Sequence, residues 1–132
     1  MTWFYKDRPV TEEDLEDQVA FVYLIENLQS GKKYIGKKLL KFTRTKKVKG
    51  KRKKVKVDSD WQTYYGSNNE LNADVEKNGK ENFRRVILHM CRSKGTANYL
   101  EMKEQILQNV LESDNWYNSQ IRCRVHKSHL KF

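Results

Sequence analysis

The segment from Lys32 to Lys56 limits the fold more than any other part of the chain. It contains fourteen lysines and arginines and not one acidic residue. Such side chains are almost never fully buried without partners, so this segment contributes little to a core. Residues 46–57 alternate crudely between basic residues and valine around Gly50, which is typical of an exposed hairpin or a flexible loop. Other residues must therefore supply the core.

The rest of the composition fits one polar globular domain. The chain has 132 residues, 37% hydrophobic and 33% charged, with a net charge of +10. We expect residues 1–132 to form a single domain with a basic insertion at about 44–58. The net charge favours a polyanionic partner. The sequence contains no recognisable signal peptide and no apolar run of membrane-spanning length, so we expect a cytoplasmic protein with no membrane partner. Cys91 and Cys123 lie far apart in the sequence, and we expect both to be free thiols.

Periodicity on either side of the basic segment predicts the regular elements. Residues 19–26 are β-branched and aromatic, and after a turn at 27–31 residues 32–40 form the return strand of a hairpin. Residues 83–90 predict a third strand. Helices are expected near the N-terminus after Thr11, from about 69 to 78, and from about 96 to 112.

This order of elements predicts an α+β fold. We expect a small, mainly antiparallel three-stranded sheet flanked by helices, with the basic segment inserted as a hairpin or loop. Ser67 or Asn68 would cap the second helix, and Gly79 would end it.

Several short motifs occur in an order that resembles the GIY-YIG nuclease family. Phe21-Val22-Tyr23 is followed, after ten residues, by Tyr34-Ile35-Gly36. The later landmarks, between about 65 and 118, resemble phage-type members of that family: Tyr65-Gly66-Ser67, Asn78-Gly79-Lys80-Glu81-Asn82-Phe83, Tyr99-Leu100-Glu101 and Tyr117-Asn118. Phe21 replaces the glycine of the family name, at a position that supplies backbone. The resemblance implies a small antiparallel sheet flanked by helices, and hydrolysis of DNA phosphodiesters with one divalent metal ion, Mg²⁺ or Mn²⁺.

The resemblance assigns roles to two tyrosines on paired strands. Tyr23 and Tyr34 correspond to tyrosines that line the family's site, where one helps to activate the attacking water. The cations nearby would lower the phenol pKa below its usual value near 10. Both rings could instead simply pack in the sheet.

Glu101 occupies the position of the family's metal-binding glutamate. One carboxylate is enough for Mg²⁺, which prefers oxygen ligands and retains several waters. Asn118 matches the family's late asparagine, a supporting residue of the site. The alternative interpretation makes Glu101 an exposed helical residue and Asn118 an ordinary turn residue.

The phosphate-stabilising cation has more than one candidate. Arg44 lies ten residues after Tyr34, close to the family's spacing, although the family places that arginine on a helix. Lys37 or Lys38 could supply the charge instead, as a point charge rather than a fork. Ser67, beside a glycine at a helix N-terminus, could either bind a phosphate or only shape the turn.

We expect the basic insertion to contact double-stranded DNA. The residues that carry this expectation are Lys46, Lys47, Lys49, Lys51, Arg52, Lys53, Lys54 and Lys56. Histidine and cysteine spacings match no compact zinc module. The sequence leaves two other functions open: a DNA-binding protein of this fold without catalysis, and an RNA-binding accessory protein. Sequence specificity would come from the core, the insertion, the tail or a homodimer. The resemblance suggests a phage source, and hence the cytoplasm of a host cell.

Overall fold

A five-stranded sheet forms the centre of the protein in the computed structural model, which describes residues 2–132. Strand β3 (Ala20–Asn27) lies between β7 (Phe83–Cys91) and β4 (Lys33–Leu39) and is antiparallel to both. Strand β1 (Trp3–Tyr5) pairs with β7 in parallel, and the two-residue β2 (Arg8–Pro9) pairs antiparallel with β1. The order β2-β1-β7-β3-β4 makes β4 an edge strand.

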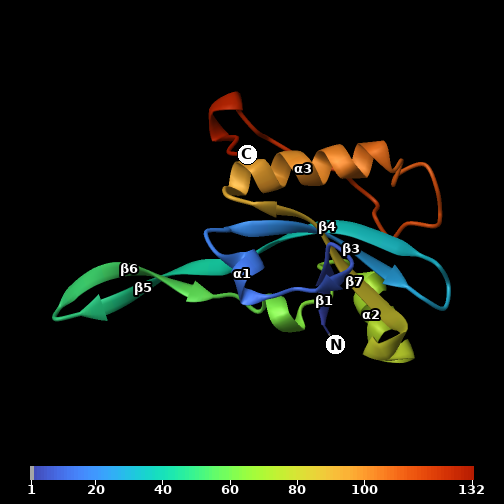
Figure 1. The fold of residues 1–132 in the computed structure, drawn as a ribbon, viewed down its shortest axis with the longest axis horizontal. Coiled ribbons are helices and arrows are strands. Elements are labelled where there is room, and N and C mark those ends of the chain that lie inside the picture. The colour runs from blue at the N-terminus through green and yellow to red at the C-terminus, as the bar shows by residue number, and fades with distance from the viewer. Residues whose placement is uncertain (1) are drawn as a thin grey trace.

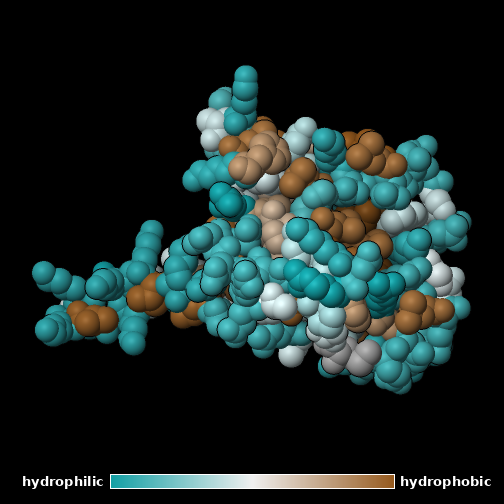
Figure 2. Space-filling model, viewed as in Figure 1, coloured by the Kyte–Doolittle hydropathy of each residue, from teal (hydrophilic) through white to brown (hydrophobic). Residues whose placement is uncertain are grey.

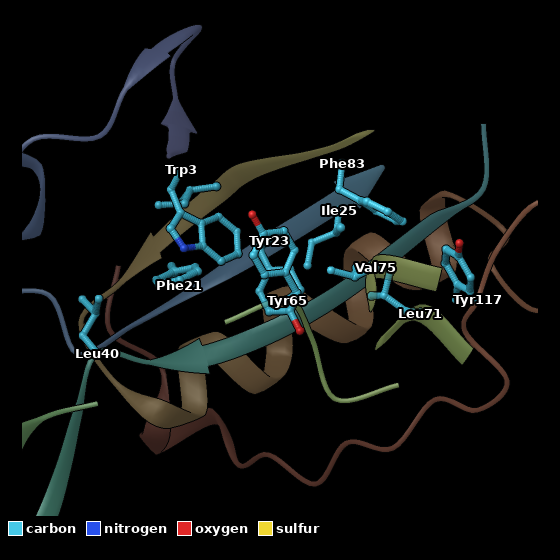
Figure 3. Close-up of a cluster of buried hydrophobic side chains, with 11 residues drawn as sticks. Trp3, Phe21, Tyr23, Ile25, Leu40, Tyr65, Leu71, Val75, Phe83 and Tyr117 are labelled. Carbon is cyan, nitrogen blue, oxygen red and sulfur yellow. The ribbon is translucent and has the colours of Figure 1, made fainter. Parts of the chain in front are cut away.

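Both faces of the sheet are covered, which explains why β3 reads as a continuous apolar run. Along a strand, alternate side chains point to opposite faces. Phe21, Tyr23 and Ile25 belong to one buried cluster, whereas Ala20 and Val22 belong to a second cluster on the other face. Figure 3 shows the first, more aromatic cluster.

Helices cover the two faces separately (Figure 1). Helix α3 (Lys94–Leu107) lies over the face that contains Ala20 and Val22. Helix α2 (Asn69–Asn78) and the 3-10 turn η1 (Trp61–Thr63) lie on the opposite face. No helix within residues 2–132 is long and apolar enough to cross a bilayer.

The helix boundaries follow capping chemistry. Asn68 is the N-cap of α2, and its side chain accepts a hydrogen bond from the backbone N–H of Leu71. Of the two expected cap candidates, Ser67 and Asn68, the structure therefore confirms Asn68. Gly79, with a φ of 89°, ends α2 as expected. Thr11 caps a single helical turn, α1 (Glu12–Leu15). The remaining 3-10 turns are η2 (Lys80–Asn82) and η3 (Lys127–His129).

The basic segment forms a hairpin that projects away from the sheet (Figures 1 and 2). Strand β5 (Lys41–Val48) pairs antiparallel with β6 (Lys51–Asp58). Lys49 and Gly50 form the two-residue turn, and both have positive φ, 50° and 77°. Turns of this type match the twist of paired strands. The expected hairpin is confirmed, and it begins slightly before the expected insertion.

Like charges face one another across this hairpin. Lys46 lies opposite Lys53, and Lys47 lies opposite Arg52. Directly opposed like charges destabilise a strand pair. Nearly all of its side chains are exposed, and Phe42 and Val55 are the two that are partly covered. The hairpin therefore carries charge that the protein itself does not neutralise.

The expected number of three strands is wrong. The sheet has five strands, because the N-terminal residues form β1 and β2, and β1 pairs with β7. The sheet is mixed, but three of its four strand pairings are antiparallel, as expected. The side chain of Trp3 is 1% exposed, and its indole N–H donates to the carbonyl of Trp61 at 2.8 Å. A three-residue strand leaves too short a run for periodicity to reveal it.

Helix α3 also ends earlier than expected. It stops at Leu107 with Gln108 as its cap, and Asn109 follows with a φ of 55°. Asparagine tolerates this left-handed conformation better than most residues. Val110 is nevertheless fully buried, because the chain turns back onto the sheet.

Candidate active site

Polar side chains from four separate segments line a pocket of about 200 Å³ beside the edge strand β4. Strand β4 provides one of them, the turn before α2 provides two, and α3 provides two more. The C-terminal segment completes the lining. The residues are Tyr34, Ser67, Asn68, Glu101, Gln105, Asn118, Ser119, Gln120 and Arg122.

Tyr34 brings a hydroxyl into this pocket from β4. Its oxygen lies 3.2 Å from the Ser67 hydroxyl. Ser67 follows Gly66, whose φ of 90° allows the sharp turn before α2. The close approach of Ser67 to Tyr34 therefore depends on a backbone conformation that glycine adopts readily.

Tyr23 lies directly behind Tyr34 and is fully buried. The two ring centroids are 6.1 Å apart, and the Tyr23 ring also meets Tyr64 edge-on at 6.0 Å. Gly36 pairs with Tyr23 across the two strands. A Cβ at Gly36 would lie only 2.7 Å from the ring carbon that bears the Tyr23 hydroxyl. The glycine of the Tyr34-Ile35-Gly36 motif is thus required by the tyrosine opposite it.

Burial raises the pKa of both tyrosines. For Tyr23 the pKa rises well above 10, first through loss of hydration and then through the nearby Tyr64 and Tyr34. For Tyr34 loss of hydration also raises the pKa, and the Ser67 hydroxyl only partly opposes it. This direction is opposite to the one expected from the neighbouring cations. Both phenols are therefore neutral at ordinary pH.

Glu101 projects from the second turn of α3 and is partly buried. Burial raises the pKa of its carboxyl group, while the Lys37 charge and the Lys37 backbone N–H act in the opposite direction. No group of three or more His, Cys, Asp or Glu side chains gathers anywhere in the described chain. Glu101 is the one acidic residue in the lining of this pocket.

Asn118 and Gln105 both use their side-chain amides to bind the backbone of Ile35. The Asn118 oxygen accepts from the Ile35 N–H at 3.1 Å, and its nitrogen donates to the Ile35 carbonyl at 2.8 Å. Gln105 donates to the same carbonyl at 3.0 Å. The Asn118 amide thereby continues the ladder of the edge strand in place of a backbone. In the structure this residue positions the pocket wall.

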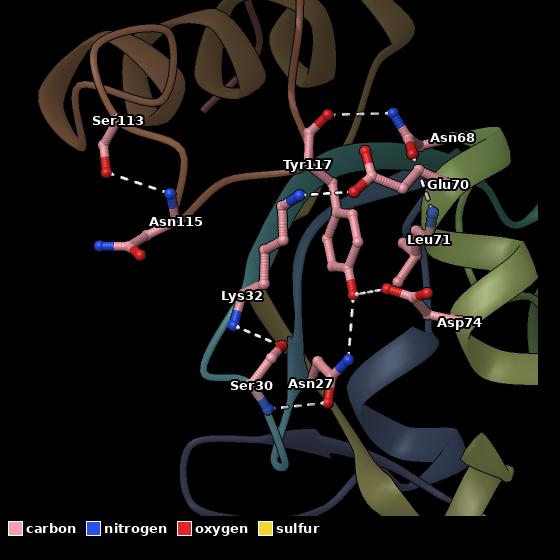
Figure 4. Close-up of polar contacts among 10 residues, drawn as sticks. All are labelled: Asn27, Ser30, Lys32, Asn68, Glu70, Leu71, Asp74, Ser113, Asn115 and Tyr117. Atoms are coloured by element: carbon pink, nitrogen blue, oxygen red, sulfur yellow. Dashed lines mark hydrogen bonds and ion pairs between the residues drawn. The ribbon is translucent and has the colours of Figure 1, made fainter. Parts of the chain in front are cut away.

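The C-terminal segment that carries Asn118 is held by backbone hydrogen bonds with Lys33 and by the contacts of the Tyr117 side chain, which Figure 4 shows. The Lys33 N–H donates to the Asn115 carbonyl, and the Tyr117 N–H donates back to the Lys33 carbonyl. The Tyr117 hydroxyl lies between Asn27 and Asp74, at 3.1 Å and 2.6 Å. These contacts join the tail to β3, β4 and α2 at once.

Cations gather on one side of the pocket. Arg122 lines both the pocket and an adjoining shallow hollow, which Lys37 and Arg124 also line. The Lys37 ammonium contacts the Asn98 side chain on α3. The guanidinium of Arg122 is exposed, and within residues 2–132 it makes no ion pair. It is therefore available to an anion that enters the pocket.

Two of the expected phosphate-binding cations lie elsewhere. Arg44 is on β5 in the exposed hairpin, with its guanidinium 4.9 Å from the Phe42 ring centroid. Lys38 forms an ion pair with Asp60 at 2.5 Å and lies 4.0 Å from the centroid of the Tyr64 ring. Neither residue lines the pocket.

The expected DNA-contacting residues divide into two groups. Ser67 is at the pocket. The others lie along the exposed hairpin: Lys46, Lys47, Lys49, Lys51, Arg52, Lys53, Lys54 and Lys56.

A divalent cation would meet a suitable set of donors in this pocket. Glu101 offers a carboxylate, and Tyr34, Ser67 and Gln105, whose side chains carry hydroxyl or amide oxygens, also line the pocket. Hard cations such as Mg²⁺ prefer oxygen donors and need few protein ligands. Among residues 2–132 no cysteine or methionine lines this pocket, and the donor set therefore fits Mg²⁺ or Mn²⁺ better than a thiophilic metal.

Sequence reasoning did not identify Arg122 and Gln105. Gln105 lies four residues after Glu101, and this spacing on a helix could have placed both on one face. Arg122 gave no comparable signal, because only the fold of the tail brings it to the pocket.

Comparison with known proteins places these features in a family. A family model described as "Putative endonuclease segE, GIY-YIG domain" matches residues 3–121. The chain is 32% identical over 98 residues to "Putative endonuclease segE" of Enterobacteria phage T4. That alignment covers 74% of this chain and 39% of the phage protein, so the chain spans about two fifths of the length of this relative. No solved structure matches this chain.

Proposed function

This chain belongs to the GIY-YIG endonuclease family, segE type, and on that premise we propose that it hydrolyses phosphodiester bonds of double-stranded DNA with Mg²⁺ or Mn²⁺. One observation carries the proposal above all. Tyr34, Glu101 and Arg122 come from three distant parts of the sequence and line one pocket. They are a hydroxyl, a metal-binding carboxylate and a phosphate-binding cation, the groups that such hydrolysis needs.

Glu101 holds the cation in this proposal. When bound, the cation would neutralise charge on the reacting phosphate and lower the pKa of a coordinated water. The partly buried position of Glu101 strengthens its attraction for a cation, because screening by water is weaker there.

Tyr34 contributes a neutral hydroxyl. Since burial raises its pKa, it acts as a hydrogen-bond donor and acceptor to the attacking water and the phosphate, not as a preformed phenolate. Tyr23 supports it from behind. Because Tyr23 is fully buried, it is a positioning residue that holds the Tyr34 ring against Ser67.

Arg122 binds the scissile phosphate, assisted by Lys37. A guanidinium can pair with two phosphate oxygens at once, whereas a lysine supplies a point charge. Lys38 adds positive potential nearby, although Asp60 neutralises part of it. Asn118 keeps the β4 edge in place through Ile35.

The hairpin binds the DNA backbone at a distance from the pocket. Its opposed lysine and arginine pairs repel one another, and phosphates would relieve that repulsion. Arg44 belongs to this surface, together with the eight basic residues named above. Phosphate contacts carry no sequence information directly, so the hairpin increases affinity without selecting a sequence.

A plasmid assay tests the proposal. We expect the purified protein to nick or linearise supercoiled plasmid with Mg²⁺ or Mn²⁺ and to leave it intact with EDTA. Glu101→Ala should abolish cutting and retain DNA binding, which depends on lysines and arginines. Glu112→Ala, an exposed acid beyond α3, is the matched control and should cut normally. Binding by the wild type with no cutting in either metal would instead identify a DNA-binding protein without catalysis.

A further inference from the structure

Gln105 presents a buried oxygen that nothing in the described chain satisfies. The residue is 5% exposed, and its Oε1 atom has no hydrogen-bond partner within residues 2–132. Its Nε2 atom donates to the Ile35 carbonyl at 3.0 Å. A buried acceptor without a partner is costly, and each such group in a folded protein calls for a specific explanation.

The donor side of Gln105 does not explain its presence. Asn118 already donates to the same Ile35 carbonyl at 2.8 Å, so that oxygen keeps a partner if Gln105 is replaced. An aliphatic side chain of similar length would fill the same space without a lone pair left over. The unexplained property is therefore the acceptor, Oε1.

Gln105 and Glu101 lie on the same face of α3, because they are four residues apart on this helix. Both side chains line the same pocket. Amide carbonyl oxygens, like carboxylates, are ligands for hard divalent cations.

We propose that Oε1 of Gln105 is the second protein oxygen of the cation site, beside the Glu101 carboxylate. This inference rests on the proposed metal-dependent function and extends it to a residue outside the resemblance. The neutral amide contributes a lone pair without adding negative charge. The repulsion of the incoming phosphate therefore stays low, and the contact with the Ile35 carbonyl fixes the orientation of the amide.

Metal binding in the absence of DNA tests this role directly. Mn²⁺ affinity would be measured by calorimetry, with free Mn²⁺ followed independently by electron paramagnetic resonance. Gln105→Met keeps the length of the side chain and removes the oxygen, and we expect about 10- to 100-fold weaker binding. Gln108→Met makes the same change just beyond the end of α3, outside the pocket, and should leave the affinity unchanged. The melting temperature in EDTA is measured for both.

Gln105→Glu separates the acceptor from the donor. It keeps an oxygen and loses the N–H that binds Ile35, and it adds a second carboxylate next to Glu101. If Oε1 is a ligand, Mn²⁺ should bind more tightly than to the wild type. Unchanged or weaker binding would overturn the role of Oε1, whereas tighter binding supports it only together with the loss in Gln105→Met, because the added charge alone attracts Mn²⁺. Gln105→Leu, which also lacks the oxygen, replaces Gln105→Met if that variant does not fold.

The outcomes distinguish this inference from the proposed function. Wild-type Mn²⁺ affinity in both Gln105 variants, with binding lost in Glu101→Ala, would overturn the role of Gln105 and leave Glu101 as the metal ligand. A wild-type protein that binds no Mn²⁺ would overturn both.

Discussion

The Tyr117 hydroxyl donates a 2.6 Å hydrogen bond to the Asp74 carboxylate and so fastens the C-terminal segment to helix α2. Tyr117 is 3% exposed, and burial followed by this hydrogen bond raises its pKa to about 12. The same hydroxyl accepts from Asn27. The position of Asn118, one residue later, depends on this contact.

Tyr117→Phe should therefore loosen the tail without altering the core packing. Asp74 and Asn27 each lose a partner, and we expect a loss of about 1–3 kcal/mol in the free energy of unfolding. Urea titration measures that loss. Tyr99→Phe, a less buried ring on α3, is the matched control. Equal stability of Tyr117→Phe and the wild type would mean that the hydroxyl pairs with water in solution.

Tyr34→Phe and Tyr23→Phe should differ in their effects on catalysis. Tyr34 reaches the pocket, and loss of its hydroxyl should slow cutting by about 10²–10⁴-fold, as for a group that assists proton transfer. Tyr23 is fully buried, so Tyr23→Phe should slow cutting less and cost about 1 kcal/mol of stability. Single-turnover rates at saturating metal provide the comparison. A larger kinetic effect at Tyr23 would contradict its assignment as a positioning residue.

Replacing Arg122 with lysine should affect the rate more than the same change at Arg44. Arg122→Lys removes a planar fork beside the pocket, and we expect a rate loss on the order of 10²-fold. Arg44→Lys keeps a charge on the exposed hairpin and should leave the rate almost unchanged. Both variants are assayed at DNA concentrations that saturate binding. The reverse order of effects would assign the phosphate-binding fork to the hairpin.

Shortening the hairpin should weaken DNA binding in a salt-dependent way. Joining Arg44 to Val55 through a Gly-Ser turn removes seven of the eight basic residues assigned to DNA contact. If about four of them touch phosphates, the slope of log K against log salt should become shallower by roughly 3 to 4. Affinity should fall equally on random and cleaved sequences. Parallel salt slopes for the two proteins would show that the hairpin does not contact phosphates.

The two cysteines should react at very different rates. Cys91 is 1% exposed, and burial raises its pKa to about 11, whereas Cys123 is partly exposed. A thiol reagent near pH 8 should modify Cys123 first and reach Cys91 only when the protein unfolds. Mass spectrometry of the labelled peptides identifies the order. Rapid labelling of Cys91 would indicate that α3 separates from the sheet.

Sequence patterns were most informative where one local rule decides the structure. The bounds of α2 follow from the Asn68 cap and from Gly79, and the basic hairpin follows from alternation around Gly50. Strand β1 escaped prediction because its three residues are held by distant partners, β7 and Trp61. The pairing of the N-terminus with β7 is a tertiary effect that local propensity does not encode.

The candidate site shows the same division. Recognisable motifs contain Tyr23, Tyr34 and Glu101, so the family resemblance could identify these three residues from the sequence alone. Arg122 depends on a tail that folds back along β4, and the neutral state of Tyr34 depends on burial. Charge counts along the chain suggested a lowered tyrosine pKa, which is the wrong direction. Such counts contain no information about the loss of hydration on burial, which raises the pKa.

The projecting hairpin also divides the protein into two regions of different local stability. Its strands pair only with each other, so they can separate while the five-stranded sheet remains intact. In hydrogen–deuterium exchange, the amides of β5 and β6 should exchange long before those of β3 and β7. Bound DNA should slow the exchange in this arm far more than in the sheet. The hairpin would then become fully ordered only when the protein binds DNA.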